Sequence, residues 1–310
     1  MSEQKSTNGR SVILPVRVRG LRFAFGLLER VAPGRGAAWV EKIWFTVPPA
    51  KPRKSRVELP TGTPFEVDLG GRLIRGTSWG DGPTVYLVHG WGGWGLQLAA
   101  YVPPLLAAGF RVITYDAPSH GESDPGHLGG RQTDMPEMAE AVRAVVAARG
   151  PAYGIVAHSI GVGALSQAMQ HGLNARRLVF VAATKDFDHT LDTFEQGLGF
   201  GPRVRAGMER RFARRFGKRI QEYDLVRVFD EIQEERDLPP LLAVHDTSDQ
   251  ETPYQGSAAI VAAWPGARLE LTEGLGHRKV LAQVDPVVAF LSTDQADVGG
   301  VGVGQETMKE

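Results

Sequence analysis

Ser159 ends an apolar stretch, Tyr153 to His158, and leads directly into helix-forming sequence with glycines at positions 161 and 163. A sharp turn from strand to helix would hold the serine Oγ above the edge of a sheet, and the helix N-terminus would favour negative charge beside it. A serine in front of a helix can also be a simple N-cap. Ala157 replaces the first glycine of the usual G-x-S-x-G pattern, a change that a small methyl group allows. We predict that Ser159 is a nucleophile.

A glycine-rich loop precedes this segment. The buried-strand run Thr84 to Val88 breaks into His89-Gly90-Trp91-Gly92-Gly93-Trp94-Gly95, where glycines leave backbone amides accessible. Attack of a serine on a carbonyl group creates an oxyanion, and loss of one fixed N–H donor to it costs about 3 to 4 kcal/mol. We predict that the backbone N–H groups of Trp91 and Ile160 are the two donors.

An acid and a base follow two later strand runs. Pro240 to His245 reads as a buried strand, and a polar turn after it offers Asp246 and Asp249. His277 lies between glycine-rich sequence and the last helix-forming segment, where a general base could reach Ser159. We predict His277 as the base and Asp249 as the acid that orients it, with Asp246 as the alternative acid.

Other polar residues near these segments have simpler interpretations. Four further histidines are expected to be packed, hydrogen-bonded supports: His89, His120, His158 and His245. A short cluster of Asp186, Asp188 and His189 has no second group of ligands at a suitable spacing. We therefore predict no metal and no cofactor.

The chain alternates between strand-like and helix-like segments from the hairpin Phe65–Leu69 and Arg72–Gly76 onward. This alternation predicts the α/β class, with a mostly parallel twisted sheet, helices on both faces and ligands at the carboxyl ends of the strands. The expected helices are 135–149, 160 to about 170, 253–263 and 279–291.

The chain order Ser159, Asp249, His277, with each residue just past a predicted strand, resembles the α/β-hydrolase superfamily over about residues 60 to 292. The segment Arg111 to Ser123 is also similar to one that many members carry between the glycine-rich loop and the nucleophile. Asp246 departs from the pattern, since many members have glycine there. The resemblance implies an α/β-hydrolase fold, and it implies that the long insertion before Pro240 is a helical cap over the active site.

Four parts are expected along the chain: an N-terminal amphipathic helical extension and linker, 1–55; the α/β-hydrolase core, 60–184 and 240–292; the helical cap, 185–239; and a disordered tail, 293–310. In the extension, Val18, Leu21, Phe25 and Leu28 recur at helical spacing. Packing of this helix on the core or the cap is the first interpretation. Arginines beside aromatic residues leave attachment to a membrane surface as an alternative.

The expected activity is that of a serine hydrolase, which cleaves a carboxylic ester or related acyl bond of a small, mainly apolar substrate through an acyl-enzyme. Trp94, Phe187 and Phe194 are predicted to line the substrate pocket. Two alternatives stay open: a non-catalytic binding module with this fold, and a lipase or acyltransferase at a membrane surface.

Composition restricts the partners. The 310 residues contain 35 Lys and Arg against 35 Asp and Glu, a balance that argues against nucleic acid as a partner. Without cysteine the chain has neither disulfides nor thiol chemistry, and it contains no run of about 18 apolar residues. A cytoplasmic protein is the default expectation, and the sequence does not indicate an oligomeric state.

Overall fold

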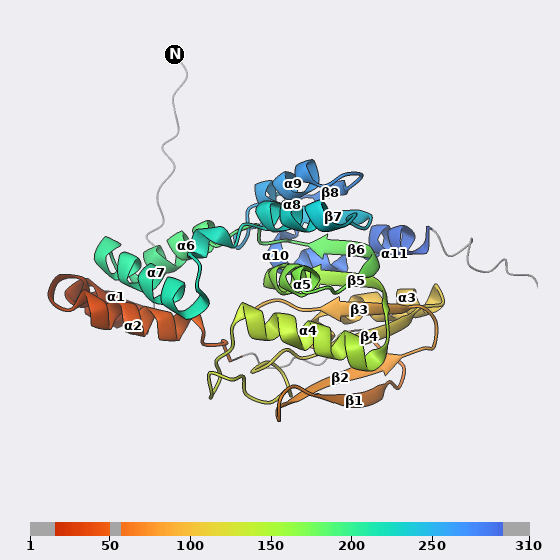
Figure 1. Ribbon diagram of the computed structural model, residues 1–310, viewed down its shortest axis with the longest axis horizontal. Coiled ribbons are helices and arrows are strands. Elements are labelled where there is room, and N and C mark those ends of the chain that lie inside the picture. The colour runs from red at the N-terminus through yellow and green to blue at the C-terminus, as the bar shows by residue number, and fades with distance from the viewer. Residues whose placement is uncertain (1–15, 50–56, 294–310) are drawn as a thin grey trace, which may run out of the picture. The chain divides into compact units, whose positions relative to one another are not determined.

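The computed structural model describes residues 16–49 and 57–293 (Figure 1). The chain divides into two compact units. The smaller unit contains the chain up to Trp44 together with Asp188–Ile220, and the larger unit contains Phe45–Phe187 and the chain from Gln221 onward. Most of the predicted linker and of the predicted tail, 293–310, lies outside the described residues.

The larger unit is built on one sheet, whose eight described strands are β1 (Thr63–Asp68), β2 (Leu73–Trp79), β3 (Thr84–Val88), β4 (Arg111–Tyr115), β5 (Ala152–His158), β6 (Ala175–Val181), β7 (Leu241–Asp246) and β8 (Arg268–Thr272). Their order is β1-β2-β4-β3-β5-β6-β7-β8. β2 pairs antiparallel with β1 and β4, and every other described pairing is parallel. The predicted mostly parallel sheet is confirmed.

Helices cover both faces of this sheet (Figure 1). The helical segments are η1 (Gly95–Tyr101), α3 (Val102–Ala107), α4 (Met135–Arg149), α5 (Ile160–Gln170), η2 (Ile220–Glu222), α8 (Leu225–Glu235), α9 (Tyr254–Ala263), α10 (Gly276–Lys279), η3 (Val280–Ala282) and α11 (Asp285–Ser292). α4, α5, α8 and α9 pack one after another. α3 and α11 share a core with alternate strand residues such as Val85 and Leu87, which point to one face of the sheet.

The last predicted helix, 279–291, is interrupted. α10 and η3 end at Ala282, the backbone of Gln283 is not helical (ψ 77°), and α11 starts anew at Asp285. Pro286 explains the break, because in a continuous helix it could not donate a hydrogen bond to the Ala282 carbonyl and its ring would clash with that group, whereas a proline fits the first turn of a new helix. His277 therefore lies in a short helix of its own, in front of the break.

The smaller unit consists of α1 (Val16–Val31), α2 (Pro33–Trp44), α6 (Asp188–Leu198) and α7 (Pro202–Phe216). α2 and α7 approach closely at two glycines: a Cβ on Gly36 would lie 2.7 Å from the Val204 side chain, and one on Gly207 would lie 2.7 Å from that of Ala37. A larger side chain at either glycine would force the helices apart.

The half-buried carboxylate of Glu29 and the buried carboxylate of Glu41 join the N-terminal extension to α7 of the insertion. Glu29 accepts hydrogen bonds from the backbone N–H groups of Gly201, Arg203 and Val204 at 2.8 to 3.1 Å, which satisfies the start of α7. Glu41 pairs with Arg211 at 2.5 Å. The N-terminal extension and the first part of the insertion thus form one helical unit.

α8 belongs to the larger unit, although its sequence lies in the predicted cap, 185–239. Its Phe229 lies 5.7 Å from Phe180 of β6 and 4.6 Å from Trp264, measured between ring centroids.

Among the helices within 16–49 and 57–293, none has both the length and the apolar character that a membrane span requires.

Candidate active site

The backbone at Ser159 is left-handed, with φ 56° and ψ −126°, between the end of β5 and the start of α5. This conformation is costly for a residue with a Cβ and persists only where the surroundings hold it. The Ser159 N–H donates to Val181 O at 3.0 Å. A Cβ on Gly161 would lie 2.6 Å from His89 O, and one on Gly90 would lie 2.9 Å from the Ser159 Cβ. Gly161 in α5 and Gly90 in the loop after β3 therefore leave room for the predicted turn.

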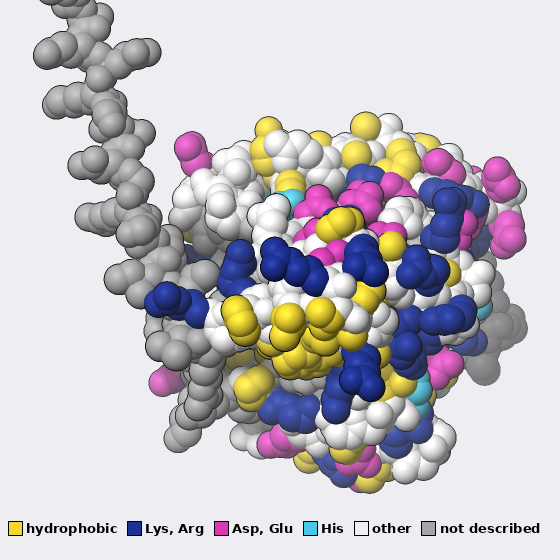
Figure 2. All heavy atoms as spheres, turned by 90° about the vertical axis from the view of Figure 1, so that its left-hand side faces the viewer, with side chains coloured by type: hydrophobic (Ala, Val, Ile, Leu, Met, Phe, Trp, Pro, Cys, Tyr) yellow, Lys and Arg dark blue, Asp and Glu magenta, His cyan; other side chains and the backbone are white. Residues whose placement is uncertain are grey.

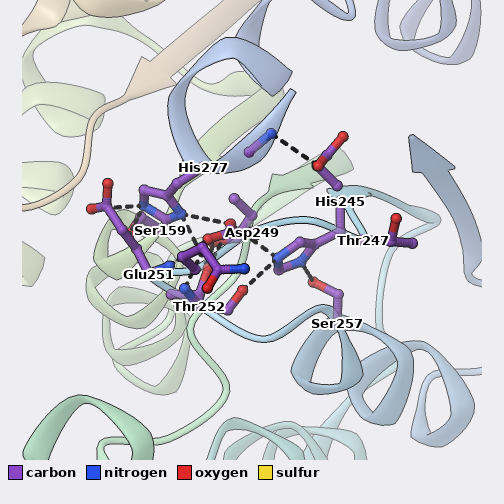
Figure 3. A network of polar contacts seen from close by, with 12 residues as sticks. Ser159, His245, Thr247, Asp249, Glu251, Thr252, Ser257 and His277 are labelled. Carbon is purple, nitrogen blue, oxygen red and sulfur yellow. Dashed lines mark hydrogen bonds and ion pairs between the residues drawn. The ribbon is translucent and has the colours of Figure 1, made fainter. Parts of the chain in front are cut away.

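The three predicted triad residues are in contact (Figure 3). His277 Nε2 lies 3.0 Å from Ser159 Oγ, and His277 Nδ1 lies 2.8 Å from Asp249 Oδ2. Because a carboxylate can only accept, Nδ1 carries the hydrogen toward Asp249 and Nε2 is the nitrogen that can accept the serine proton. The arrangement can activate Ser159 as a nucleophile.

Asp249 is held as an anion. Its Oδ1 accepts from the backbone N–H groups of Glu251 and Thr252 at 2.8 and 2.9 Å, and its Oδ2 accepts from Thr252 Oγ1 at 3.0 Å as well as from His277. Burial alone would raise the pKa of the Asp249 carboxyl, but hydrogen bonds from His245, His277 and Thr252 outweigh it and hold that pKa well below its usual range.

Asp246, the alternative acid, does not contact His277 among the described contacts. Its oxygens accept from the backbone N–H groups of Leu275 and Gly276 at 3.0 and 2.9 Å and from Thr272 Oγ1 at 2.7 Å. Although burial opposes ionisation, these bonds lower the pKa of Asp246 to about 2. Asp246 therefore ties the end of β7 to the segment that carries His277, and the structure brings Asp249 to His277 Nδ1.

A second histidine touches the acid. His245 is fully buried on β7, and its Nε2 lies 3.3 Å from Asp249 Oδ2 and 3.0 Å from Thr252 O. Its Nδ1 lies 2.7 Å from Ser257 Oγ on α9 (Figure 3). The sequence predicted His245 as a packed, hydrogen-bonded support, without the contact to Asp249. Its position four residues before Asp249, on the strand that delivers the acid, is the signal that could have indicated this contact.

Two buried histidines shape the loop that contains Trp91. His89 donates from Nδ1 to Gly90 O at 2.8 Å and accepts at Nε2 from the Ala117 N–H at 2.9 Å. His120 accepts at Nε2 from the Gly92 N–H at 3.0 Å. Neither the Trp91 nor the Ile160 N–H finds a hydrogen-bond partner within residues 16–49 and 57–293. Both predicted donors thus have an unused hydrogen within the described part of the chain.

These supporting histidines are neutral at pH 7. Burial lowers the pKa of His89 to about 4 and the pKa of His120 to about 3. Burial, with a smaller contribution from nearby His277, lowers the pKa of His158 to about 3. His158 Nε2 donates to His277 O at 3.0 Å, so it holds the backbone of the base. Their contacts agree with the predicted role as packed supports.

The predicted pocket residues are distributed over the two units. Trp94 is half-buried at the start of η1, and the Phe187 ring lies 6.0 Å from that of Tyr223, both in the larger unit. Phe194 lies on α6 in the smaller unit, where its ring packs 5.3 Å from Trp44. The pocket therefore stays a prediction.

The short acidic cluster is occupied by other contacts, since Asp186 Oδ2 lies 2.7 Å from Lys185 Nζ. Across the described part of the chain, no group of three or more His, Asp or Glu side chains is placed to hold a metal ion.

A family model for the alpha/beta hydrolase family matches residues 85–293. Because this match covers more than half of the chain, the protein belongs to the alpha/beta hydrolase family, and the resemblance inferred from the sequence is confirmed. The dihydrolipoyllysine-residue acetyltransferase component of an acetoin cleaving system from Pseudomonas putida is 40% identical over 85 residues. That match covers 27% of this chain and 22% of the relative, so the chain spans only about a fifth of its length.

Solved structures share the fold. A bromoperoxidase from Bacillus anthracis has 16% identity and a TM-score of 0.54, covering 74% of this chain and 100% of its own. An esterase from Exiguobacterium antarcticum has 19% identity and a TM-score of 0.54, covering 75% and 100%. A thioesterase domain from the curacin biosynthetic pathway has 17% identity and a TM-score of 0.55, covering 76% and 100%. These neighbours carry different names, so the chemistry must be argued from the site.

Exchange of each aspartate tests the assignment of the acid. Asp249→Asn should lower kcat for a nitrophenyl ester about ten-thousandfold, because His277 loses the partner that fixes its tautomer. Asp246→Asn should instead lower Tm by on the order of 5 °C, because buried N–H groups lose an acceptor. Steady-state kinetics and thermal unfolding of both variants separate the two roles. A loss of kcat with Asp246→Asn as large as with Asp249→Asn would contradict the assignment.

The buried histidines predict a loss of stability in acid. Histidine in the unfolded chain has a pKa near 6.5, whereas folded His89, His120 and His158 protonate only at about 4, 3 and 3. From pH 6.5 down to about 4 the unfolded chain binds more protons, so each histidine lowers the free energy of unfolding by up to about 1.4 kcal/mol per pH unit. This stabilisation is fully present above pH 6.5.

Thermal unfolding measured from pH 8 downward should show Tm falling below about pH 6.5. His120→Gln should flatten this dependence, and the exposed His171→Gln, a matched control, should leave it unchanged. A Tm that is constant between pH 7 and pH 5 would contradict the neutral, buried state of these side chains.

Proposed function

We propose that this member of the family is a serine hydrolase that cleaves a carboxylic ester, or a related acyl bond, of a small and mainly apolar substrate. The observation that carries the proposal is the continuous path of short contacts from Ser159 Oγ through His277 to Asp249, at 3.0 and 2.8 Å. Ser159 also lies in a strained turn that presents its side chain at the edge of the sheet. A serine that only caps a helix would need neither the contact with His277 nor the strained turn.

The reaction would begin with attack by Ser159 Oγ on the carbonyl carbon, while the serine proton moves to His277 Nε2. The carbonyl oxygen becomes an oxyanion that accepts from the Trp91 and Ile160 N–H groups. Collapse of this intermediate breaks the bond to the alcohol, which takes the proton from Nε2 and leaves an acyl-enzyme.

Water would complete the cycle. His277 Nε2 takes a proton from the attacking water, the second tetrahedral intermediate collapses to the free acid, and the proton returns to Ser159 Oγ. Glu251 supports the charged imidazolium in both halves, since its carboxylate lies 4.0 Å from Nε2. Asp249, held ionised by its own hydrogen bonds, stabilises the same charge from the Nδ1 side.

A serine nucleophile favours acyl transfer over ring opening of epoxides, since that chemistry in similar folds uses an aspartate to form an alkyl ester. Trp94 and Phe187 are the pocket residues proposed from the larger unit, and they favour apolar acyl or alcohol groups. Phe194 remains a proposed pocket residue from the smaller unit. The leaving group could be an alcohol or a thiol, because the same steps serve both.

Kinetics on nitrophenyl esters of increasing acyl length test the proposal. Ser159→Ala should lower kcat/KM by on the order of ten-thousandfold or more, because the nucleophile is lost while the fold is kept. Ser166→Ala is the matched control: this serine is buried in α5 and donates to Val162 O at 2.7 Å, so its loss should leave turnover nearly unchanged. Turnover by Ser159→Ala that equals the wild type would refute the mechanism, and a folded wild type without turnover would favour a binding module.

A further inference from the structure

α1 exposes an apolar stripe. Phe23, Leu27 and Val31 are spaced four residues apart, which places them on one face of the helix. Their exposed fractions are 78%, 51% and 68%, so the three side chains form an exposed apolar patch rather than a single exposed residue. Figure 2 shows hydrophobic side chains gathered in a band on this side of the molecule, with Lys and Arg side chains around it.

The packing of the helical unit does not require this stripe. Phe25 lies on a different face of α1, is fully buried, and packs 4.7 Å from the Trp39 ring and 6.0 Å from the Phe200 ring. α1 therefore already has a buried face within its own unit. Leaving three further large apolar side chains in water costs solubility without stabilising the fold.

Basic residues accompany the exposed apolar ones on both helices of the extension. On α1, Arg19 stands four residues before Phe23 and Arg30 three residues after Leu27, and both arginines are exposed. These spacings place them beside the stripe. On α2, Trp39 is 40% exposed, with exposed basic residues four positions before it and three positions after it, Arg35 and Lys42.

The charge of the chain is unevenly distributed. Residues 16–44 and 188–220 contain fourteen Lys and Arg against six Asp and Glu, an excess of eight positive charges. The whole chain, in contrast, has 35 Lys and Arg against 35 Asp and Glu. The positive potential of the helical unit would attract anionic surfaces. An apolar stripe with basic neighbours in a unit of high positive charge is the pattern of a helix that lies in the surface of an anionic membrane.

We propose that this face of α1 and α2 binds the surface of an anionic lipid bilayer. Phe23, Leu27 and Val31 enter the boundary between headgroups and acyl chains, while Arg19 and Arg30 pair with lipid phosphates. A nucleic acid would satisfy the arginines but would leave Leu27 and Val31 without an apolar partner. A symmetric dimer through the stripe would bring the arginines of two copies together, which like-charge repulsion opposes.

The test is cosedimentation of the full chain with vesicles of phosphatidylcholine that contain about one-third phosphatidylserine, and with vesicles of phosphatidylcholine alone. We expect binding to the anionic vesicles that weakens with added salt, and much weaker binding to neutral ones. The triple variant Phe23→Ser, Leu27→Ser, Val31→Ser should weaken binding at least about tenfold. Arg19→Gln with Arg30→Gln should weaken it by on the order of 25-fold, since each basic residue contributes about fivefold.

Leu271→Ser is the matched control, because Leu271 is 48% exposed on β8, in the larger unit. It should bind vesicles like the wild type, and the triple variant should keep the wild-type rate on a water-soluble ester, so that lost binding cannot be ascribed to unfolding. Equal binding of wild type and triple variant would overturn the proposal. So would a stable dimer in light scattering that the triple variant dissociates, or binding to duplex DNA but not to vesicles.

Discussion

The turn at Ser159 is the constraint on which the site depends. A non-glycine residue at φ 56° is strained, and Ala182 after β6 adopts a similar conformation at φ 50°. Both follow neighbouring parallel strands, and the two turns are held by the same kind of bond: the Ser159 N–H donates to Val181 O, and the Ala182 N–H donates to Val244 O at 2.9 Å. The end of each strand thus holds the turn that follows its neighbour, and Ser159, Asp249 and His277 meet at one edge of the sheet.

Several buried polar side chains around this turn hydrogen-bond to the backbone of neighbouring loops. His89 and His120 hold the Trp91 loop through main-chain bonds, and Asp246 fixes the backbone in front of His277. Because neutral imidazoles can donate and accept at once, they rigidify loops without placing further charge beside the acid. Asp249 keeps its negative charge inside, and that charge lies where an imidazolium would form during the reaction.

Much of this arrangement could be predicted from the sequence. Ser159 and His277 were found because each follows a strand run at a glycine-rich turn, and parallel strands bring such turns to a common edge. The sequence favoured Asp249 as the acid but left Asp246 open as the alternative, since three residues of a turn decide which carboxylate faces His277. The packing of α2 against α7 could not be predicted either, because it depends on the close approach of the two helices at Gly36, which sequence periodicity does not reveal.

The central claim is that Ser159 is the nucleophile, and covalent labelling of the nucleophile tests it most directly. The native protein would be incubated with a fluorophosphonate, digested, and the modified peptide sequenced by mass spectrometry. The account predicts one phosphonylated residue, Ser159, and a much lower labelling rate in His277→Ala, because the serine is then no longer activated. Label on another residue, or labelling of Ser159 at the same rate without His277, would contradict it.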